Sequence, residues 1–504
     1  MRLKDLAADL PASEVIGSGE AQFNAVEYDS RRVKPGALFV AVPGARHDGH
    51  DYLAQAVEAG AAAILVQADR RSKWAELPVP RLAVPDTHRA LAEVAAAFFG
   101  RPGRKLTVVG VTGTDGKTSL CHLITHVLES AGESAGLMST AENRAAGRPL
   151  ADSGRFTTPE PPQVQSLLAQ MVEADCRYAV LEATSHGLAQ HRLASCEFDV
   201  AVMTNVGRDH MDFHGSWEEY LAAKGRLFQM LDEAADKGVT KTAVLNAEDP
   251  AHRYFQSLTR ARVVTYGLDA AADVRAADMR PEGWGTRFRL RTPAGETEPR
   301  LGRPGAFNVA NALGAAAASL ALGLNLGSIT SGLESWPGAP GRMERVDAGQ
   351  PFRVVVDFAH APESLRRVLG ELRAGSRGRV IAVFGCIGER DRDRRHAMGR
   401  VAAELADYTY VTDDNPYSED RDAILSEIAR GLREAGRREE HDFAVVPDRR
   451  EAIAQALAMA VDEDVVLLAG KGHEREVVLA DGSYECHDGE VARRVLRELF
   501  PASR

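Results

Sequence analysis

Short runs of Val, Ile, Leu and Ala alternate with longer amphipathic segments along most of the chain, and no other feature constrains the fold as strongly. A buried strand of a parallel sheet has a nearly continuous apolar sequence, because helices cover both faces of such a sheet. The alternation therefore predicts an α/β fold class with mostly parallel sheets. The expected strands include 37–42 (ALFVAV), 61–66 (AAAILV), 107–111 (TVVGV), 379–385 (RVIAVFG) and 464–470 (DVVLLAG).

Two segments interrupt this alternation in a chain of 504 residues, which is too long for one ordinary domain. Segment 100–106 (GRPGRKL) is rich in Gly, Pro and Arg, and segment 335–344 (SWPGAPGRME) contains two prolines. Proline and glycine clusters end regular elements and commonly connect domains. We therefore predict three domains, at residues 1–100, 101–337 and 338–504.

The net charge limits the kinds of partner that we expect, and the cysteine pattern indicates the cellular compartment. The 61 basic and 72 acidic residues give a formal net charge of −11, which argues against nucleic acid or an anionic membrane as the main partner. The five cysteines are scattered and form no C-x-x-C pair, so neither a disulfide framework nor a structural zinc site is indicated. No apolar run approaches the roughly 20 residues that span a bilayer. We expect a cytoplasmic protein, with small molecules as partners.

Residues 107–119 (TVVGVTGTDGKTS) place an apolar run before a glycine-rich turn that ends in Lys117 and Thr118, with a helical segment behind it. In such a loop, backbone N–H groups and a helix N-terminus surround phosphates, lysine neutralises charge, and the threonine hydroxyl binds Mg²⁺. The general Walker A spacing requires glycine at position 111, which is valine here, so the match is to G-T-D-G-K-T. The sequence predicts a mononucleotide site.

Two further groups of polar residues follow apolar runs. Glu182 ends the run 178–182, and a second group comprises Asn205, Asp209, His210, Asp212 and His214. Mg²⁺ prefers oxygen ligands, so Glu182 is the better candidate, whereas a single histidine is equally expected to hydrogen-bond a turn. Lys224 lies in a helix-like segment, 217–228, whose spacing alone favours a solvated surface lysine.

Longer motifs surround these residues. They are T-G-T-D-G-K-T (112–118), E-A-T-S-H-G-L-A-Q-H-R (182–192), T-N-V-G-R-D-H-M-D-F-H-G (204–215) and G-A-F-N-V-A-N (305–311), with D-S-R-R-V-K-P-G-A-L-F-V-A (29–41), G-R-M-E (341–344), D-F-A-H-A-P (357–362), F-G-C-I-G-E-R-D (384–391), D-N-P (414–416) and A-G-K-G-H-E (469–474) elsewhere. Together they resemble the Mur ligase family over essentially the whole chain. Among its members they are most similar to those that add the third amino acid of the peptidoglycan peptide.

The resemblance implies a three-domain architecture: a UDP-sugar-binding N-terminal domain, a central P-loop ATPase domain and a C-terminal Rossmann-like domain that binds the amino acid. It also implies ATP-dependent amide formation in peptidoglycan precursor synthesis, and hence a part in cell-wall biogenesis, cell shape and division. The γ-phosphoryl group of ATP would pass to the D-glutamate side-chain carboxylate of UDP-MurNAc-L-Ala-D-Glu, and an amine would then attack the acyl phosphate. Phosphorylation supplies the leaving group that a carboxylate lacks, while Mg²⁺ and Lys117 offset the negative charge.

The same resemblance implies roles for individual residues. Lys117, Lys224 and His210 are catalytic, and the Mg²⁺ ligands are Thr118, Glu182, His210 and Lys224, the last as a carbamate formed with CO₂. The ATP-binding residues are Gly113, Thr114, Asp115, Gly116, Lys117, Thr118, Ser119, Asn308, Asn311, Arg342 and Asp357. The UDP-MurNAc-dipeptide-binding residues are Tyr28, Ser30, Thr157, Thr158, Thr184, Gln190 and Arg192. The amino-acid-binding residues are Arg390, Asp414, Asn415, Tyr417, Gly470 and Glu474.

The motif D-N-P-Y (414–417) decides which amino acid we expect. Family members that accept meso-diaminopimelate usually carry D-N-P-R, whose arginine can pair with the distal carboxylate of that substrate. Tyr417 lacks this charge, so L-lysine or L-ornithine is favoured, with Asp414 and Glu474 facing the side-chain ammonium and Arg390 facing the α-carboxylate. Arg421 or another basic residue could replace the missing arginine, so meso-diaminopimelate stays an alternative.

Other functions remain open at this point. Within the same class of enzymes, the rivals are the ligase that adds D-Ala-D-Ala and folylpolyglutamate synthase. The segment 29–41 argues against the folate enzyme, and the motifs 208–215 and 469–474 favour addition of the third residue. A nucleotide-dependent switch is the rival of a different class, but it has no need of Glu182, His210 and Lys224 together. We expect a monomer.

Overall fold

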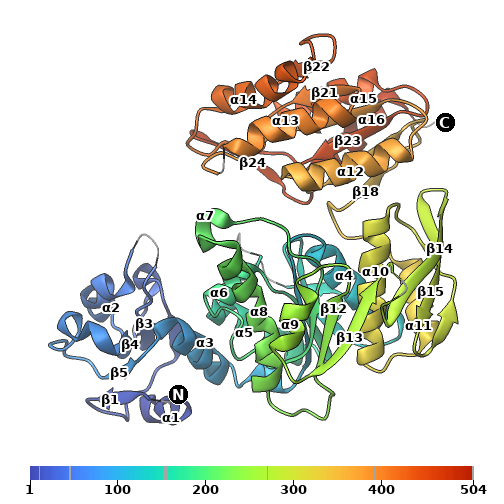
Figure 1. Cartoon of the computed structure of the whole chain (residues 1–504). Helices are drawn as coiled ribbons and strands as arrows, with labels where there is room; N and C mark the ends of the chain where they lie inside the picture. The colour runs from blue at the N-terminus through green and yellow to red at the C-terminus, as the bar shows by residue number, and fades with distance from the viewer. Residues whose placement is uncertain (11, 45–46, 151–156, 270, 391, 502–504) are drawn as a thin grey trace. The chain divides into compact units, whose positions relative to one another are not determined.

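A computed structural model of the chain describes residues 1–501 apart from 11, 45–46, 151–156, 270 and 391. The motif 384–391 therefore ends on a residue outside the described part. The chain divides into two compact units. One unit comprises Met1–Arg280, Arg287–Arg300 and Val309–Ser335, and the other comprises Pro281–Thr286, Leu301–Asn308 and Trp336–Arg504. Figure 1 follows the chain by colour through both units.

The first sheet contains five strands in the order β1-β5-β4-β3-β2, with β2 to β5 parallel and β1 antiparallel. Its elements are α1 (Leu3–Asp9), β1 (Glu14–Ile16), β2 (Ala25–Glu27), β3 (Ala37–Val40), α2 (Leu53–Glu58), β4 (Ala63–Gln67), β5 (Arg81–Val84) and α3 (Thr87–Phe98), with 3₁₀ turns at Ser30–Arg32, Gly49–Tyr52, Ala68–Lys73 and Pro102–Arg104. Apolar clusters cover both faces of this sheet. The strands expected at 37–42 and 61–66 are confirmed as β3 and β4.

The second sheet carries the phosphate-loop motif. Its path is β16-β15-β14-β13-β12-β11-β6-β10-β7-β8-β9, and β17 pairs with β15. The strands are β6 (Thr107–Thr112), β7 (Ala135–Met138), β8 (Asn143–Ala145), β9 (Arg148–Pro149), β10 (Tyr178–Glu182), β11 (Phe198–Met203), β12 (Thr242–Asn246), β13 (Arg262–Gly267), β14 (Val274–Glu282), β15 (Gly285–Thr292), β16 (Gly295–Thr297) and β17 (Arg300–Leu301). The helices are α4 (Lys117–Ser130), α5 (Pro161–Glu173), α6 (Ser185–Ala189), α7 (Met211–His214), α8 (Trp217–Glu233), α9 (His252–Ser257), α10 (Ala306–Ala321) and α11 (Leu326–Ser335).

The centre of this sheet, from β7 through β10, β6, β11 and β12 to β13, is parallel, as the apolar runs predicted. Antiparallel strands extend both edges, at β8 and β9 on one side and at β16 on the other. We did not predict these edge strands from the sequence. They are two or three residues long and mostly exposed or half-exposed, and the neighbouring β15 (GTRFRLRT) alternates Phe and Leu with arginine, so none of them has the continuous apolar run of a buried strand.

The third sheet contains six strands in the order β18-β19-β23-β20-β21-β22, all parallel except β18. Its strands are β18 (Glu344–Val346), β19 (Arg353–Asp357), β20 (Val380–Phe384), β21 (Tyr408–Val411), β22 (Phe443–Val445) and β23 (Val465–Ala469), followed by the separate hairpin β24 (Glu476–Leu479) and β25 (Gly482–Glu485). Its helices are α12 (Pro362–Ala374), α13 (Asp393–Leu405), α14 (Arg421–Glu434), α15 (Arg449–Met459) and α16 (Asp488–Leu499).

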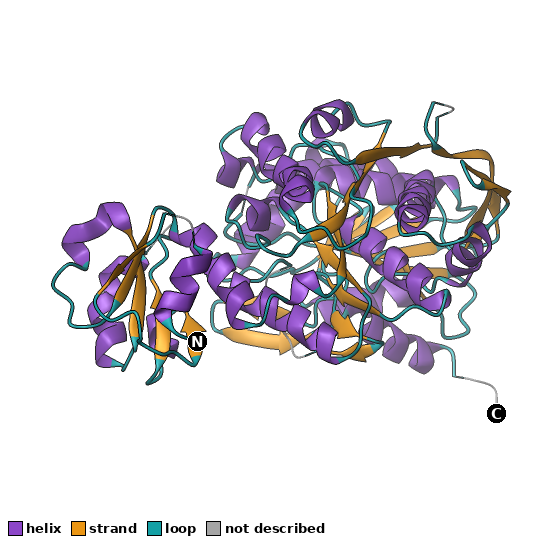
Figure 2. Cartoon of the chain, turned by 90° about the horizontal axis from the view of Figure 1, so that it is seen from below, coloured by secondary structure: helices purple, strands orange, loops and turns teal. Residues whose placement is uncertain are grey.

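Alternate residues of these six strands face two different apolar cores. Val355, Ala382 and Leu467 pack with α12, α13 and α14, whereas Val354, Val383 and Leu468 pack with α15 and α16. Because side chains alternate along a strand, this division shows helices on both faces of the sheet. Figure 2 colours the helices purple and the strands orange along the whole chain. The predicted α/β fold class is confirmed. The domain boundaries after residues 100 and 337 stay a prediction.

Among the described residues, no helix is both long enough and apolar enough to cross a bilayer.

A buried carboxylate joins β11 to β6 at an irregular point of their pairing. The register shifts between Phe198 and Val200, and Asp199 is the extra residue. Its fully buried carboxylate accepts the Val108 N–H at 2.7 Å and contacts the ammonium groups of Lys237 at 2.6 Å and Lys241 at 2.9 Å. The side chain thus supplies the acceptor that the bulged ladder lacks.

Replacing Asp199 by Ala should lower the free energy of unfolding by about 3–5 kcal/mol, because two lysines lose their buried counter-charge and Val108 N–H loses its acceptor. Urea titration followed by circular dichroism measures this change. Glu133→Ala, which removes a more exposed pair with Arg177, is the control and should cost no more than about 1 kcal/mol. Equal effects of the two substitutions would contradict the assignment.

Candidate active site

The phosphate loop has the predicted arrangement of strand, glycine turn and helix. β6 ends at Thr112, residues 113–116 form the turn, and α4 begins at Lys117. Gly113 and Gly116 have φ values of 150° and 83°, and a Cβ on Gly113 would lie 1.8 Å from Thr204 Oγ1. Glycine is therefore required by both backbone conformation and space.

The segment after β11 braces this loop. Asp115 N–H donates to Asn205 Oδ1 at 3.0 Å, and Asn205 Nδ2 donates to Asp115 O at 3.1 Å. Thr204 Oγ1 also donates to Asp115 O, at 2.6 Å, and Thr114 N–H donates to Asn205 O at 2.8 Å. Sequence reasoning placed Asn205 only in a polar cluster and missed this bracing role, although the T-N motif marked the position.

The loop also binds two lysines. Lys117 Nζ donates to the carbonyls of Gly113 at 3.1 Å and Thr114 at 2.8 Å, and Lys224 Nζ donates to Gly113 O at 2.6 Å. Lys224 is 1% exposed, and its ammonium lies 4.3 Å from the centre of the Tyr220 ring. Burial, and then the charge of Lys117, lower the pKa of Lys224 well below the usual lysine value. The solvated surface position that spacing favoured for Lys224 is wrong.

Glu182 and Thr118 lie together, as predicted for two ligands of one metal ion. Thr118 Oγ1 is 3.1 and 3.0 Å from the two oxygens of the buried Glu182 carboxylate. Thr140, which follows β7, donates to Glu182 Oε2 from its N–H at 2.9 Å and from its hydroxyl at 3.0 Å. Sequence reasoning missed Thr140 because a hydroxyl in a turn carries no signal of its own.

His210 lies in the loop before α7, with its ring 4.6 Å from the ring of His186. Burial lowers the pKa of His210 to about 4, and the positive charges of Lys117 and Lys224 act in the same direction. Its imidazole is therefore neutral near pH 7, which is the form that binds metals. Among the described residues, however, no group of three or more His, Cys, Asp and Glu side chains lies close enough to hold a metal ion by itself.

The residues predicted for the dipeptide lie next to Glu182. Thr158 Oγ1 donates to Glu182 O at 2.9 Å, Thr184 Oγ1 donates to Thr158 Oγ1 at 2.9 Å, and Arg192 donates to Thr158 O at 2.9 Å. The hydroxyl oxygens of Thr157 and Thr140 lie 3.0 Å apart, and Gln190 is the C-cap residue of α6.

The residues predicted for the uridine end lie near the first sheet. The Tyr28 hydroxyl accepts from Gln163 Nε2 at 3.2 Å, and Ser30 Oγ donates to Gln55 at 3.0 Å.

The predicted ATP-binding residues outside the phosphate loop make contacts within their own units. A Cβ on Gly116 would lie 2.7 Å from Asn311 Oδ1, which puts Asn311 beside the phosphate loop. Asn308 Nδ2 donates to Pro304 O at 2.7 Å. In the second unit, the Asp357 carboxylate accepts Met343 N–H at 2.8 Å and Ala359 N–H at 2.9 Å, and the Arg342 guanidinium lies 4.4 Å from the centre of the Phe358 ring.

The predicted amino-acid pocket contains a buried carboxylate that no described residue serves as a hydrogen-bond donor. Asp414 is 1% exposed, and neither of its oxygens has a hydrogen-bond partner among the residues that the structure describes. The ammonium of Lys471, itself fully buried, is 3.6 Å away, and burial raises the pKa of Asp414 above its usual value. A buried polar atom without a partner is costly, so an orphaned carboxylate indicates a place for a donor from a ligand.

Neighbouring residues of this pocket are already paired. Lys471 Nζ contacts Glu474 Oε2 at 2.8 Å and Asn415 Oδ1 at 3.2 Å, and Asn415 Nδ2 donates to Glu474 Oε2 at 2.9 Å. Gly470, with φ 104°, follows β23 close to Asp414. Tyr417 has a left-handed backbone and donates its N–H to Val478 O at 3.1 Å.

Arg390 and Arg421 differ in their exposure and in their ion pairing. The exposed Arg390 follows Glu389, whose N–H donates to Glu419, and buried Arg395 fixes Glu419 by two hydrogen bonds of 2.8 and 2.7 Å. Arg421 instead forms an ion pair with the buried Asp413. That pairing weakens the alternative in which Arg421 replaces the arginine of D-N-P-R.

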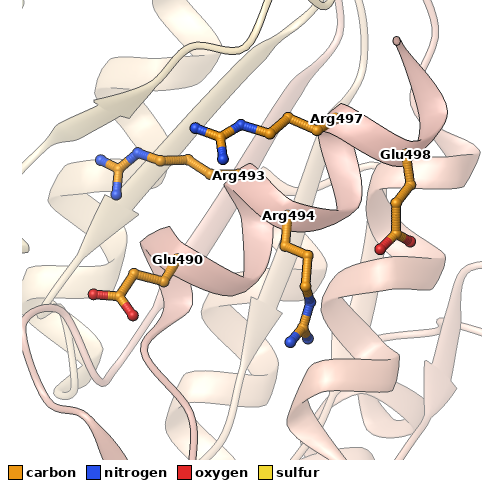
Figure 3. A pocket seen from close by; sticks show the side chains of 5 residues that line it. All are labelled: Glu490, Arg493, Arg494, Arg497 and Glu498. Carbon is orange, nitrogen blue, oxygen red and sulfur yellow. The ribbon is translucent and has the colours of Figure 1, made fainter.

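A separate hollow lies on one face of α16. It has a volume of about 470 Å³ and is lined by Glu490, Arg493, Arg494, Arg497 and Glu498. Figure 3 shows these side chains projecting from a single helix. None of them belongs to the predicted site residues, and the charges are mixed, so this hollow is not the site that the motifs predict.

Comparisons with known proteins identify the family to which the chain is similar. Three family models match: the Mur ligase family catalytic domain at residues 22–99, the Mur ligase middle domain at 111–319 and the Mur ligase glutamate ligase domain at 341–472. The chain is 45% identical to a UDP-N-acetylmuramyl-tripeptide synthetase of Roseiflexus sp. (strain RS-1), over 99% of both chains. It is 41% identical to a UDP-N-acetylmuramoyl-L-alanyl-D-glutamate–2,6-diaminopimelate ligase of Geobacillus thermodenitrificans (strain NG80-2), over 99% of this chain and 100% of the relative.

Solved structures show the same fold. A 2,6-diaminopimelate ligase of the same name matches with a TM-score of 0.69 and 28% identity, over 99% of each chain. A folylpolyglutamate synthase of Mycobacterium tuberculosis complexed with ADP and AMPPCP matches with a TM-score of 0.63 and 17% identity, over 82% of this chain and 95% of the other. At that identity the second match shows the fold alone.

Asn205→Ala should weaken binding of ATP about 30-fold, because the phosphate loop loses two hydrogen bonds that shape its backbone, each worth about 1 kcal/mol. Isothermal titration with an ATP analogue that resists hydrolysis measures the affinity. Asn325→Ala, which removes the hydrogen bond to Ser328 N–H at the start of α11, is the matched control and should leave ATP affinity unchanged. Unchanged affinity in Asn205→Ala would refute the bracing role.

Proposed function

This chain belongs to the Mur ligase family of ATP-dependent amide ligases, and on that premise we propose that it adds a diamino acid to UDP-MurNAc-L-Ala-D-Glu. The amide forms at the side-chain carboxylate of D-glutamate, as in a UDP-N-acetylmuramoyl-tripeptide synthetase. The observation that carries the proposal is the orphaned carboxylate of Asp414 beside Lys471 and Glu474, which suits the side-chain ammonium of a diamino acid. We also propose that the enzyme forms the amide at the expense of ATP, that it acts in the cytoplasm, and that it is a monomer.

The proposed reaction has two steps, phosphorylation of the carboxylate and attack of the amine. An oxygen of the D-glutamate carboxylate attacks the γ-phosphorus of ATP, the bond to the β-phosphate oxygen breaks, and ADP leaves. The α-amine of the incoming amino acid then attacks the acyl carbon, loses a proton, and inorganic phosphate leaves from the tetrahedral intermediate. The loop 113–119 holds the phosphates, and Lys117 offsets the charge that accumulates during transfer.

We propose Thr118, Glu182, His210 and a carbamate of Lys224 as the groups that hold Mg²⁺. The donor set fits, because hydroxyl and carboxylate oxygens already lie 3.0 Å apart at Thr118 and Glu182, and His210 is neutral. Bound Mg²⁺ would polarise the transferred phosphoryl group. Lys224 fits carbamate formation because burial disfavours its ammonium form, and only the neutral amine combines with CO₂.

The peptide substrate would lie along the hydroxyl groups beside Glu182. We propose Thr157, Thr158, Thr184, Gln190 and Arg192 as its ligands, and Tyr28 with Ser30 as ligands of the uridine end. The Arg192 guanidinium forms an ion pair with Glu160 Oε1 at 2.6 Å and donates to Thr158 O. It is therefore already oriented toward the threonine residues beside Glu182. Asn308, Asn311, Arg342 and Asp357 are proposed as the remaining ATP contacts.

We favour L-lysine or L-ornithine as the amino acid. Asp414 and Glu474 share the single charge of Lys471, which leaves the three groups with one net negative charge for a substrate ammonium. Tyr417 offers no cation to a distal carboxylate, and Arg421 is paired with Asp413. Arg390 is proposed for the α-carboxylate. The names of the relatives at 37–42% identity favour the second candidate, meso-2,6-diaminopimelate.

A panel of amino acids tests the choice. Enzyme supplied with UDP-MurNAc-L-Ala-D-Glu, ATP and Mg²⁺ should release phosphate at least about tenfold faster with L-lysine or L-ornithine than with meso-diaminopimelate, because one unpaired carboxylate costs more than 1.4 kcal/mol. Tyr417→Arg should shift that ratio toward meso-diaminopimelate. Faster release with meso-diaminopimelate by the unaltered enzyme would overturn the choice of amino acid but not the ligase reaction.

Lys224→Ala should lower kcat about 100-fold or more, because the group that orders the metal ligands is lost. Short carboxylic acids such as acetate should restore part of the activity by occupying the space of the carbamate. Lys237→Ala is the control: it removes a partly buried lysine of the same unit, which pairs with Asp199, so any loss of its activity should not respond to acetate. A lack of rescue in Lys224→Ala would contradict the carbamate.

A further inference from the structure

Arg449 is a fully buried arginine whose guanidinium binds four oxygens. Its Nε and Nη2 donate to the two oxygens of Asp488 at 2.7 and 2.6 Å, and Asp488 is also fully buried. Its Nη1 donates to Asp413 O at 3.0 Å, and its Nη2 also donates to Ala469 O at 2.8 Å. Arg449 is the first residue of α15, and Asp488 is the first residue of α16.

The two carbonyl groups lie at the start of two different loops of the proposed amino-acid pocket. Asp413 O immediately precedes Asp414 in the loop after β21, and Ala469 O immediately precedes Gly470 and Lys471 in the loop after β23. β20 lies between β21 and β23 in the sheet, so no backbone ladder joins these strands. Arg449 therefore links two loops that the sheet itself leaves separate.

A buried ion pair is weak evidence for a stabilising role, since well-packed apolar residues often replace such a pair without loss of stability. The two carbonyl contacts are different, because no apolar side chain can reproduce them. A second arginine–aspartate pair in the same unit does not contact the loops of the pocket. Arg379 also binds Asp464 through two nitrogens, at 3.1 and 2.7 Å, but it does so at the amino ends of β20 and β23, away from the pocket.

We propose that the pair Arg449 and Asp488 positions the loops 413–417 and 469–474 for binding of the amino acid substrate. Asp488 orients the guanidinium, and the guanidinium fixes the two carbonyls, so that Asp414, Asn415 and Lys471 face one another. Neither residue touches the substrate, and both are positioning residues. The inference rests on the proposed function, because it concerns the same pocket.

The charge of Arg449 supports the same role. Asp414 is buried and receives no hydrogen bond from the described part of the chain, and the positive charges that favour its ionised form come from Lys471 and Arg449, with His360 contributing less. Glu474 acts in the opposite direction. A neutral residue at position 449 would therefore leave the pocket with a carboxyl group that ionises less readily.

Arg449→Lys tests the proposal, because lysine keeps the positive charge but cannot bind Asp488 and both carbonyls at once. The KM for the amino acid should rise about tenfold or more, because small displacements of binding groups have large kinetic effects. The KM values for ATP and for UDP-MurNAc-L-Ala-D-Glu should change by less than about twofold. Arg379→Lys is the matched control and should leave the KM for the amino acid unchanged.

A double variant keeps the test decisive if Arg449→Lys folds poorly. Arg449→Met combined with Asp488→Leu removes both charges, so the fold should survive while the loops lose the link that runs through the guanidinium, and the KM for the amino acid should still rise. An unchanged KM for the amino acid in a folded variant, or an equal rise in all three KM values, would overturn the proposal. Failure of the proposed function would look different: the unaltered enzyme would release no phosphate with any amino acid.

Discussion

The hydrogen bonds between Asn205 and the backbone of Asp115 connect the end of β11 to the phosphate loop at the end of β6. The surroundings of the phosphate loop depend on this link, because the loop it shapes presents Gly113 O to both Lys117 and Lys224. Glu182 reaches the same region from β10, the other neighbour of β6. Adjacent parallel strands end at one edge of the sheet, so three strands deliver these groups to one place.

The sheet of the second unit repeats this principle with a different device. The loops after β20, β21 and β23 also lie at one edge of a parallel sheet, but β21 and β23 are not neighbours. Buried arginines make the connections there: Arg449 binds two carbonyls, and Arg395 fixes Glu419, which in turn accepts Glu389 N–H. Each guanidinium is matched by carboxylates, as burial of a charge requires.

The sequence correctly predicted the strands at 37–42, 61–66 and 107–111 and the order of strand, loop and helix around Lys117. It also correctly predicted the family. A buried parallel strand and a glycine loop have strong local signatures, because their sequences must satisfy burial and positive φ at fixed positions. The half-exposed edge strands from 274 to 297 were missed, since exposed faces tolerate charge. Thr140 and Arg449 were missed because their role exists only through contacts with residues about 40, 36 and 20 positions away.

Lys224 illustrates the difference between what the sequence and what the tertiary structure determine. The sequence by itself determined the fold class, the phosphate loop and the residue types available for chemistry, because these follow from local burial patterns and backbone constraints. Its spacing placed Lys224 on the surface, and only the tertiary structure decided that this lysine lies buried against Gly113 O. The physical reason is general: whether an amine is solvated or desolvated depends on what packs against its helix, and that packing comes from distant parts of the chain.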